Sequence, residues 1–257
     1  MSRPAPALRA VSALAALELR LTARRGENVL VTVIIPVAVL LFFAGTSIVP
    51  GIGGDPVDFL LPGALALAVI ASGLVNLGIA TAYERSYGVL KRLGGAPLPR
   101  WGLIAAKIGA ILVLEVVQVA VLVGVAVVVL HWAPGVGWNP ALLVAALVLG
   151  TLAFAGLGLL LAGSLRAEAT LALANGLFLG FLMLGGIVLP IDHLPAFLQP
   201  IAAVLPATAL ADLLRISLAS SAATAAAAAA SPTGPALILL GWGVAAAGLA
   251  VRTFRWE

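Results

Sequence analysis

The sequence predicts an all-α polytopic membrane protein with six transmembrane helices. The chain has 257 residues, of which 63% are hydrophobic and 9% are charged, and its mean hydropathy is +1.20. A soluble domain is about 45–50% apolar and about 25% charged, so this composition excludes an ordinary soluble fold. Six apolar runs long enough to span a bilayer alternate with short loops rich in glycine and proline. We therefore expect a single transmembrane domain over residues 1–257.

Residues 1–28 are expected to form an interfacial helix before the first span. Apolar residues recur at helical spacing over 8–19, whereas Arg9, Arg20 and Arg24 fall on another side. Such a helix would lie along the membrane surface with its arginines near anionic headgroups. An ordinary basic lead-in is the alternative. The following apolar run is about 21 residues long, which exceeds the roughly 7–15 residues of a signal-peptide core, so we expect a retained span.

The expected spans are 29–49, 59–82, 108–130, 141–163, 169–189 and 235–251. The segment 190–218 differs from them, because Pro190, Pro195, Pro200 and Pro206 leave no piece long enough to cross a bilayer. Two short helices that enter the membrane and return to the outer face fit this pattern better. We therefore expect a re-entrant helical hairpin that ends near Arg215.

The basic residues predict which side of the membrane each loop occupies. With the N-terminus inside, all of the 14 lysines and arginines except Arg215 fall in cytosolic segments. The positive-inside rule therefore places both termini in the cytosol. This distribution over short loops does not predict nucleic-acid binding. No metal site is expected, because the two histidines are scattered and the chain contains no cysteine.

The segment 83–107 is a charged loop between two strongly apolar spans. Its charged residues are Glu84, Arg85, Lys91, Arg92, Arg100 and Lys107. A short helix within it would present Val89, Leu90 and Leu93 beside the basic side chains. That mixed surface suits docking into a groove on a soluble protein, with apolar anchors and a charged rim. A solvated loop near anionic lipid is the alternative.

Two motifs resemble the permease subunits of type-2 ABC exporters, a family that exports drugs, polysaccharides and lipids. The first motif consists of Glu84, Arg85, Gly88, Leu90, Arg92, Leu93 and Pro97. The second follows the fifth span and consists of Gly185, Gly186, Pro190, Leu194, Pro195, Leu198, Gln199, 205–208 and 213–215. The chain departs from the family pattern at Ser86, Val89 and Lys91, where the family often has an acid, a threonine and an acid. These departures make the loop more basic.

The resemblance implies a division of labour between subunits. A separate cytosolic ATPase, in two copies, would bind Mg-ATP, and this chain would hold no cofactor and hydrolyse nothing itself. The sequence indeed contains no G-x-x-x-x-G-K-[ST] motif. The loop 84–100 would be the coupling helix, a second copy or a sister permease would complete the pathway, and 190–218 would cap the exit. The arginine- and alanine-rich composition suggests a bacterial genome of high GC content, and we expect the protein in the bacterial cell membrane.

Four polar residues lie at similar depth inside the expected spans: Asn76, Glu115, Gln118 and Asn175. Glu115 is roughly 10 Å deep at about 1.5 Å per residue, so it should face protein or water. We expect a polar layer that lines the inward cavity or the subunit interface. Substrate contact or gating is one interpretation, and an interhelical hydrogen-bond clasp with a protonated Glu115 is the other.

Three function classes compete. The first is the export permease, for which sparse aromatic and charged residues favour a drug, natural product or lipid-like cargo. The second is an ATP-independent secondary transporter or channel that uses Glu115, although such proteins place more ionisable residues at the midplane. The third is an intramembrane enzyme, which the sequence disfavours because its spans carry no catalytic motif. Gly156, Gly158, Gly176 and Gly180 are expected to allow close helix contact.

Overall fold

The computed structural model describes residues 7–24, 26–46, 55–94, 100–135, 137–218 and 231–253. Within these ranges every regular element is a helix. Five helical segments are long and apolar enough to cross a membrane: Pro56–Ser86, Trp101–Val128, Pro140–Ser164, Ala167–Leu184 and Thr233–Thr253. The prediction of an all-α polytopic membrane protein is therefore confirmed.

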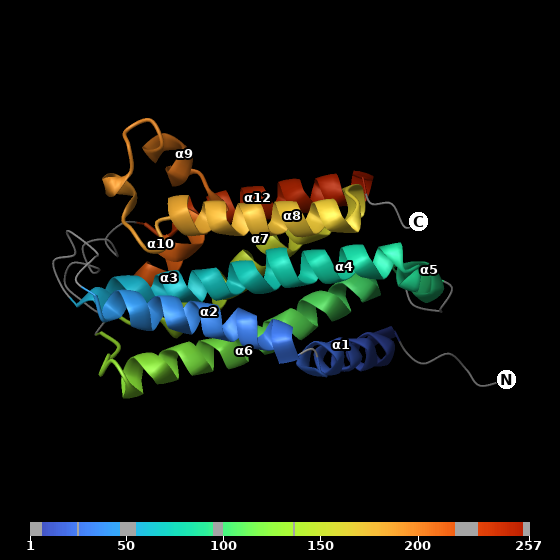
Figure 1. Cartoon of the computed structure of the whole chain (residues 1–257), viewed down its shortest axis with the longest axis horizontal. Coiled ribbons are helices and arrows are strands. Elements are labelled where there is room, and N and C mark those ends of the chain that lie inside the picture. The colour runs from blue at the N-terminus through green and yellow to red at the C-terminus, as the bar shows by residue number, and fades with distance from the viewer. Residues whose placement is uncertain are drawn as a thin grey trace.

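The helices follow the expected order. They are α1 (Ala7–Arg24), α2 (Gly26–Ala44), α3 (Pro56–Ile70), η1 (Ala71–Asn76), α4 (Leu77–Ser86), α5 (Val89–Gly94), α6 (Arg100–Val128), α7 (Pro140–Ser164), α8 (Ala167–Leu184), η2 (Ile191–His193), α9 (Gln199–Ala203), α10 (Pro206–Leu218) and α12 (Thr233–Thr253). The long helices lie side by side in one elongated bundle (Figure 1). We call its two ends the α5 end, which also carries α1, and the α9 end, which also carries α10.

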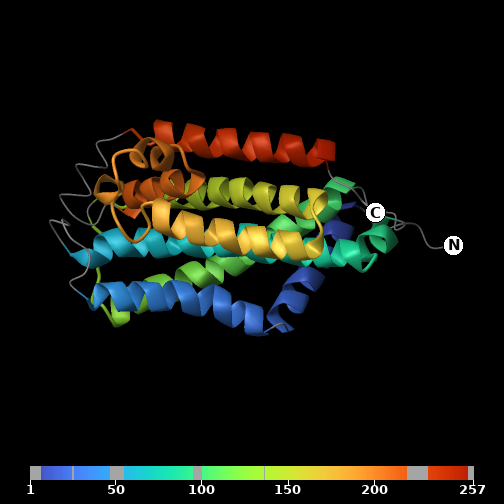
Figure 2. The same cartoon turned by 45° about the horizontal axis from the view of Figure 1, so that its top comes forward.

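The first expected span corresponds to α2, which begins earlier than predicted and contains Pro36. Its strongly apolar part, Thr32–Ala44, is shorter than the other five candidate spans, and residues 47–49 lie outside the described residues. The total of six crossings therefore stays a prediction. The expected amphipathic helix is present as α1, which turns away from the direction of α2 (Figure 2). Arg9, Arg20 and Arg24 are exposed on it, as predicted.

The second span is one continuous helical segment built from α3, η1 and α4. Asp55 caps its start by accepting a hydrogen bond from the Val57 amide at 3.0 Å, and Pro56 occupies the first turn, where its missing N–H is tolerated. The middle turn, Ala71–Asn76, is a π-helix. Almost every side chain of α3 is buried, because α2, α6, α7 and α10 surround it. A helix that is apolar on all sides is expected at such a central position.

Small residues allow α7 to approach this central segment closely. A Cβ atom at Gly158 would lie 2.5 Å from the Gly73 carbonyl oxygen, so only glycine fits there. By contrast, a Cβ atom at Gly176 or Gly180 would meet no atom within 4 Å in this chain. Of the four glycines that the sequence analysis named, Gly158 makes the tightest helix contact, and a Cβ atom at Gly156 would lie 3.2 Å from Ala246 Cβ on α12.

The expected hairpin region contains short helices, as predicted. Pro190 precedes η2, Pro200 lies in the first turn of α9, and Pro206 begins α10. Figure 1 shows α9 outside the long helices, at the end where α10 joins the bundle. Nearly all of α10 is buried, and it packs against α3, α7 and α12. Its insertion into the outer leaflet stays a prediction.

We predict that Gly158→Ala destabilises the fold. The new methyl group would force α7 away from η1, which costs about 1–3 kcal/mol in a packed interior. Thermal unfolding of the detergent-purified protein measures this loss as a lower Tm. Gly109→Ala on α6 is the control, because its Cβ would meet no atom within 4 Å and alanine favours helix. Equal Tm values for the two variants would contradict the proposed close contact.

Candidate functional site

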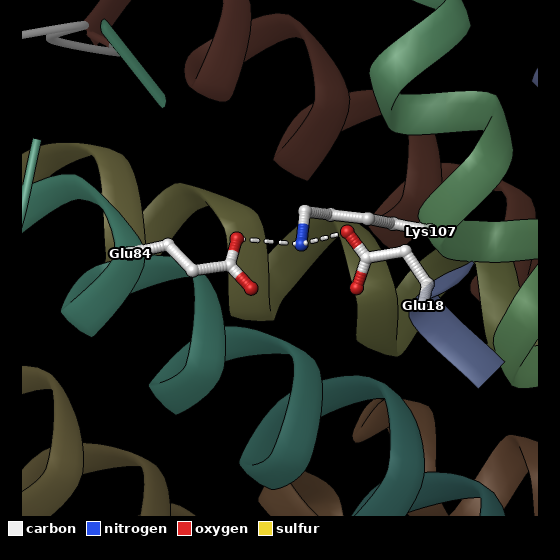
Figure 3. Close-up of polar contacts among 3 residues, drawn as sticks. All are labelled: Glu18, Glu84 and Lys107. Carbon is white, nitrogen blue, oxygen red and sulfur yellow. Dashed lines mark hydrogen bonds and ion pairs between the residues drawn. The ribbon is translucent and has the colours of Figure 1, made fainter. Parts of the chain in front are cut away.

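A buried lysine joins three helices at the α5 end. The Lys107 side chain on α6 is only 3% exposed, and its Nζ lies 2.9 Å from Glu18 Oε1 and 2.7 Å from Glu84 Oε2 (Figure 3). Glu18 comes from α1 and Glu84 from the end of α4. A desolvated ammonium is stable only when its charge is matched, and two carboxylates match it here. We call this arrangement the Lys107 clamp, because it ties α1 to the second and third spans.

Arg85 makes the corresponding contacts on the other side of α4. Its Nη1 donates to the Gly163 carbonyl oxygen at 2.7 Å, and its Nη2 donates to the Leu165 carbonyl oxygen. These carbonyls lie at the C-terminal end of α7, where backbone acceptors lack helical partners and the helix dipole favours a cation. Glu84 and Arg85 thus bind other parts of the same chain. The sequence analysis had placed both residues in the docking loop.

The short helix α5 presents the exposed part of this loop. Gly88 has φ of +69°, a conformation that favours glycine, and it turns the chain from α4 into α5. Leu90 is fully buried and anchors α5, whereas Val89, Lys91 and Arg92 are exposed. The predicted mixed surface of apolar and basic side chains is therefore present on α5. Pro97 and the side chain of Leu93 lie outside the described residues.

Two of the four interior polar residues share one hydrogen-bond network. Asn76 Nδ2 donates to Thr32 Oγ1 at 2.7 Å, and Ser72 Oγ donates to Gln118 Oε1 at 3.1 Å. Gln118 Nε2 also donates to the Thr32 carbonyl oxygen at 3.4 Å. The network joins α2, η1 and α6 next to a cavity of about 60 Å³, whose lining includes Glu18, Ser72, Asn76 and Lys107. Polar side chains therefore continue from the Lys107 clamp into the bundle.

The other two interior polar residues lie elsewhere. Glu115 is 2% exposed, and its Oε2 lies 2.6 Å from Thr151 Oγ1 on α7, which itself lies 2.7 Å from the Leu147 carbonyl oxygen. Thr151 has a single hydroxyl proton, so both contacts are satisfied together when Glu115 carries a proton. Asn175 is exposed on α8 and donates to the Leu171 carbonyl oxygen at 2.9 Å. The four residues therefore make three separate sets of contacts within this chain, and their role as a polar layer stays a prediction.

Arg215 occupies a buried position at the opposite end of the bundle. Its Nη1 lies 3.0 Å from Asp212 Oδ1, its Nη2 donates to the Gly186 carbonyl oxygen, and its guanidinium carbon lies 4.0 Å from the Phe59 ring centroid. These contacts connect α10 to the chain after α8 and to the start of α3. Arg215 thus fixes the hairpin region against two spans, which is a structural role for this end of the protein.

A known protein family matches most of the chain. Residues 9–219 match the family model described as ABC-2 type transporter. The chain belongs to this family. It is therefore a multi-pass membrane protein, and the resemblance of the chain to this family is confirmed. Family membership also associates the chain with ABC transporters.

A curated relative gives a narrower comparison. The chain is 35% identical over 125 residues to the linearmycin resistance permease protein LnrN of Bacillus subtilis (strain 168). The match covers 48% of this chain and 31% of that protein. The aligned segment thus spans about a third of the relative's length.

The sequence analysis missed several residues that make the ion pairs and hydrogen bonds described above. Glu18 was not singled out, although it is the acid on an otherwise basic amphipathic helix. Lys107 was assigned to the charged loop without a partner, because its ion pairs join residues 89 and 23 positions apart. Thr32, Ser72 and Thr151 carry no sequence signal, since single hydroxyl residues are common in membrane helices.

We predict that Lys107→Met strongly destabilises the protein. The substitution leaves Glu18 and Glu84 close together without a cation, and removing one partner from a buried ion pair costs about 3–5 kcal/mol. The Tm in detergent should fall accordingly. Adding Glu18→Gln and Glu84→Gln should restore much of the loss, whereas Lys91→Met at an exposed position should have little effect. If the single and triple variants were equally stable, the clamp would have no electrostatic role.

Proposed function

We propose that this chain is the permease subunit of an ATP-driven ABC exporter and that α5 receives the ATPase. The observation that carries this proposal is the combination of an exposed mixed surface and a rigid attachment. Val89, Lys91 and Arg92 offer apolar and basic contacts to a soluble partner, as protein interfaces require. Leu90, directly between them, is fully buried and fixes α5 to the bundle.

The contacts around α5 offer a route from the ATPase to the spans. A displacement of α5 reaches α4 through the short turn at Gly88. A movement of α4 would in turn shift α6 and α1, because Glu84 is bound to Lys107, which also binds Glu18. It would also shift the end of α7, because Arg85 is bound there. A network of this kind transmits motion when it has two discrete arrangements. We infer that the arrangement seen here is one of these two and that ATP binding in the partner favours the other.

The complex would contain two ATPase subunits, each with Mg-ATP, and a second permease copy or a sister permease. The α5 end would face the cytosol of a bacterial cell. In the described part of the chain, the basic residues other than Arg215 lie at that end, which supports this orientation. The hairpin region held by Arg215 would then close the outer end of the pathway.

The cargo we propose is a drug, natural product or lipid-like amphipath that leaves the cell. Apolar spans with few aromatic residues support an amphipathic cargo over a polysaccharide. The relative named as a linearmycin resistance permease supports a role in resistance. The shared segment covers only 31% of that relative, so its activity is transferred here as part of the proposal.

The docking proposal predicts that introducing acidic side chains on α5 releases the ATPase. The permease would be co-expressed with the ATP-binding protein encoded beside it, and the ATPase retained after detergent purification would be measured. Val89→Asp and Arg92→Glu should each reduce the retained ATPase at least about tenfold, because a central interface contact is worth about 2 kcal/mol or more. Arg166→Glu is the matched control, since Arg166 is exposed in the turn between α7 and α8.

Two outcomes would change the proposal. Normal retention by both α5 variants, with unaltered Tm, would place the ATPase contact outside α5. Failure of the unmodified permease to bind any candidate ATPase would favour the second function, an ATP-independent transporter that uses Glu115. The observation that favours this second function is the buried Glu115 carboxyl group, whose Oε1 has no hydrogen-bond partner among the described residues.

A second prediction separates these functions at Glu115. In the ATP-driven exporter, Glu115→Gln retains most of the activity, because glutamine is nearly isosteric with a protonated glutamic acid. In a proton-coupled transporter the same change abolishes transport, because the amide cannot release a proton. The measurement is uptake or efflux of a tested compound by membrane vesicles, with and without ATP. Thr151→Val serves as the companion variant, since it removes the hydrogen-bond partner and keeps the carboxyl group.

A further inference from the structure

An apolar groove of about 550 Å³ opens on the side of the bundle between α6 and α12. Both helices pack on α7, and the groove lies between them in the half of the bundle near the α5 end. Its lining includes Gly156 on α7 and Gly243 on α12, two helices that pack closely against each other. Its rim includes Trp101 and Val244, which are 56% and 71% exposed. The volume is typical of ligand sites, which occupy about 300–1,000 Å³.

The groove is polar only near the α5 end. Thr81 and Lys107 line it there. The Lys107 ammonium is paired with Glu18 and Glu84, whereas Thr81 is 2% exposed and its hydroxyl has no hydrogen-bond partner among the described residues. Three exposed basic residues adjoin the same end of the groove. Val251 and Leu90 both line the groove. Arg252 directly follows Val251 in the sequence, and Lys91 and Arg92 directly follow Leu90. Along the groove toward the α5 end, the site therefore offers first a long apolar cleft, then the Thr81 hydroxyl, and then an excess of positive charge.

This order of chemical groups matches a membrane phospholipid. The helices α6, α7 and α12 are among those able to cross a bilayer, so acyl chains surround the groove. Water would gain few hydrogen bonds along the apolar walls. An ester carbonyl can accept a hydrogen bond from the buried Thr81 hydroxyl, and an anionic phosphate complements the basic residues. A helix of a second copy would fill the cleft but would leave the hydroxyl and the basic residues without complementary groups.

We propose that this groove binds one acyl chain of an anionic phospholipid from the membrane leaflet at the α5 end. The ester region lies at Thr81 and the headgroup lies near Arg252 and α5. The bound chain contacts Leu90, which anchors α5, so lipid and α5 stabilise each other's position. The apolar cleft is separate from the exposed side chains proposed to contact an ATPase, although Lys91 and Arg92 adjoin both, and lipid binding is expected whether or not α5 receives an ATPase.

The test measures lipid binding to the detergent-purified permease by native mass spectrometry. Dioleoyl phosphatidylglycerol and dioleoyl phosphatidylcholine are titrated separately, and the unmodified protein should bind the anionic lipid more tightly. Gly243→Leu adds a large apolar side chain at a glycine that lines the groove, and its Cβ would meet the Ala153 backbone at an ordinary 3.7 Å. We expect binding of the first phospholipid to weaken about tenfold or more through lost methylene contacts.

Matched variants distinguish the groove from the general lipid surface. Gly248→Leu makes the same change on the same helix, where a Cβ would meet no atom within 4 Å, and should bind lipid normally. Thr81→Val keeps the shape and removes the hydroxyl, and should weaken binding about fivefold without lowering the Tm. Arg252→Gln should remove part of the preference for phosphatidylglycerol and leave phosphatidylcholine binding unchanged.

Two results would overturn the proposal. The first is unchanged lipid binding by both Gly243→Leu and a second variant in the groove, Ala247→Leu. Two variants are used because one of them could misfold. The second is efficient disulfide cross-linking of two chains through Val244→Cys in native membranes. Because the natural chain has no cysteine, such a dimer would place a second copy over the groove. Absence of that cross-link supports an occupant from the lipid phase.

Discussion

The arrangement of the α5 end depends on one buried cation between two carboxylates. Lys107 is removed from water by the helices around it, and a lone ammonium in such a place would be strongly disfavoured. Glu18 and Glu84 match its charge and thereby determine where α1 and the end of α4 must lie. The ion pair contributes little to net stability, because the cost of removing the three charges from water offsets much of their attraction. Its main effect is to select the positions of α1 and α4.

Polar contacts can determine which helices become neighbours in a membrane, because lipid provides no hydrophobic force between helices. Spans associate through close packing and hydrogen bonds, and both occur along the second span. The contact of Gly158 with Gly73 brings α7 close to the π-helical turn, while Ser72 and Asn76 on that turn bind Gln118 and Thr32. A π-helix re-aims side chains relative to an α-helix and is frequent at functional sites. The second span therefore serves as the centre of the protein and also joins its two ends.

The two ends of the bundle use similar chemistry for different purposes. At the α5 end, Arg85 binds carbonyls at the C-terminal end of α7, and at the α9 end Arg215 binds a carbonyl just after α8. In each case a guanidinium group satisfies backbone acceptors that a helix leaves without partners. Arg85 stabilises the platform that carries α5. Arg215 stabilises the hairpin region, which therefore cannot separate from the spans without loss of these contacts.

The sequence by itself determined the membrane class, the order of the helices, the amphipathic α1, the short helices after α8 and the family. These features follow from run lengths, proline positions and charge distribution, which act locally or through the membrane. The sequence did not determine that Glu84 and Arg85 bind other parts of the chain, that Glu115 and Gln118 have different hydrogen-bond partners, or that Glu18 pairs with Lys107. Each of these depends on which helices become neighbours. Residues 18, 84 and 107 meet only when three helices pack together, and that choice belongs to the tertiary structure.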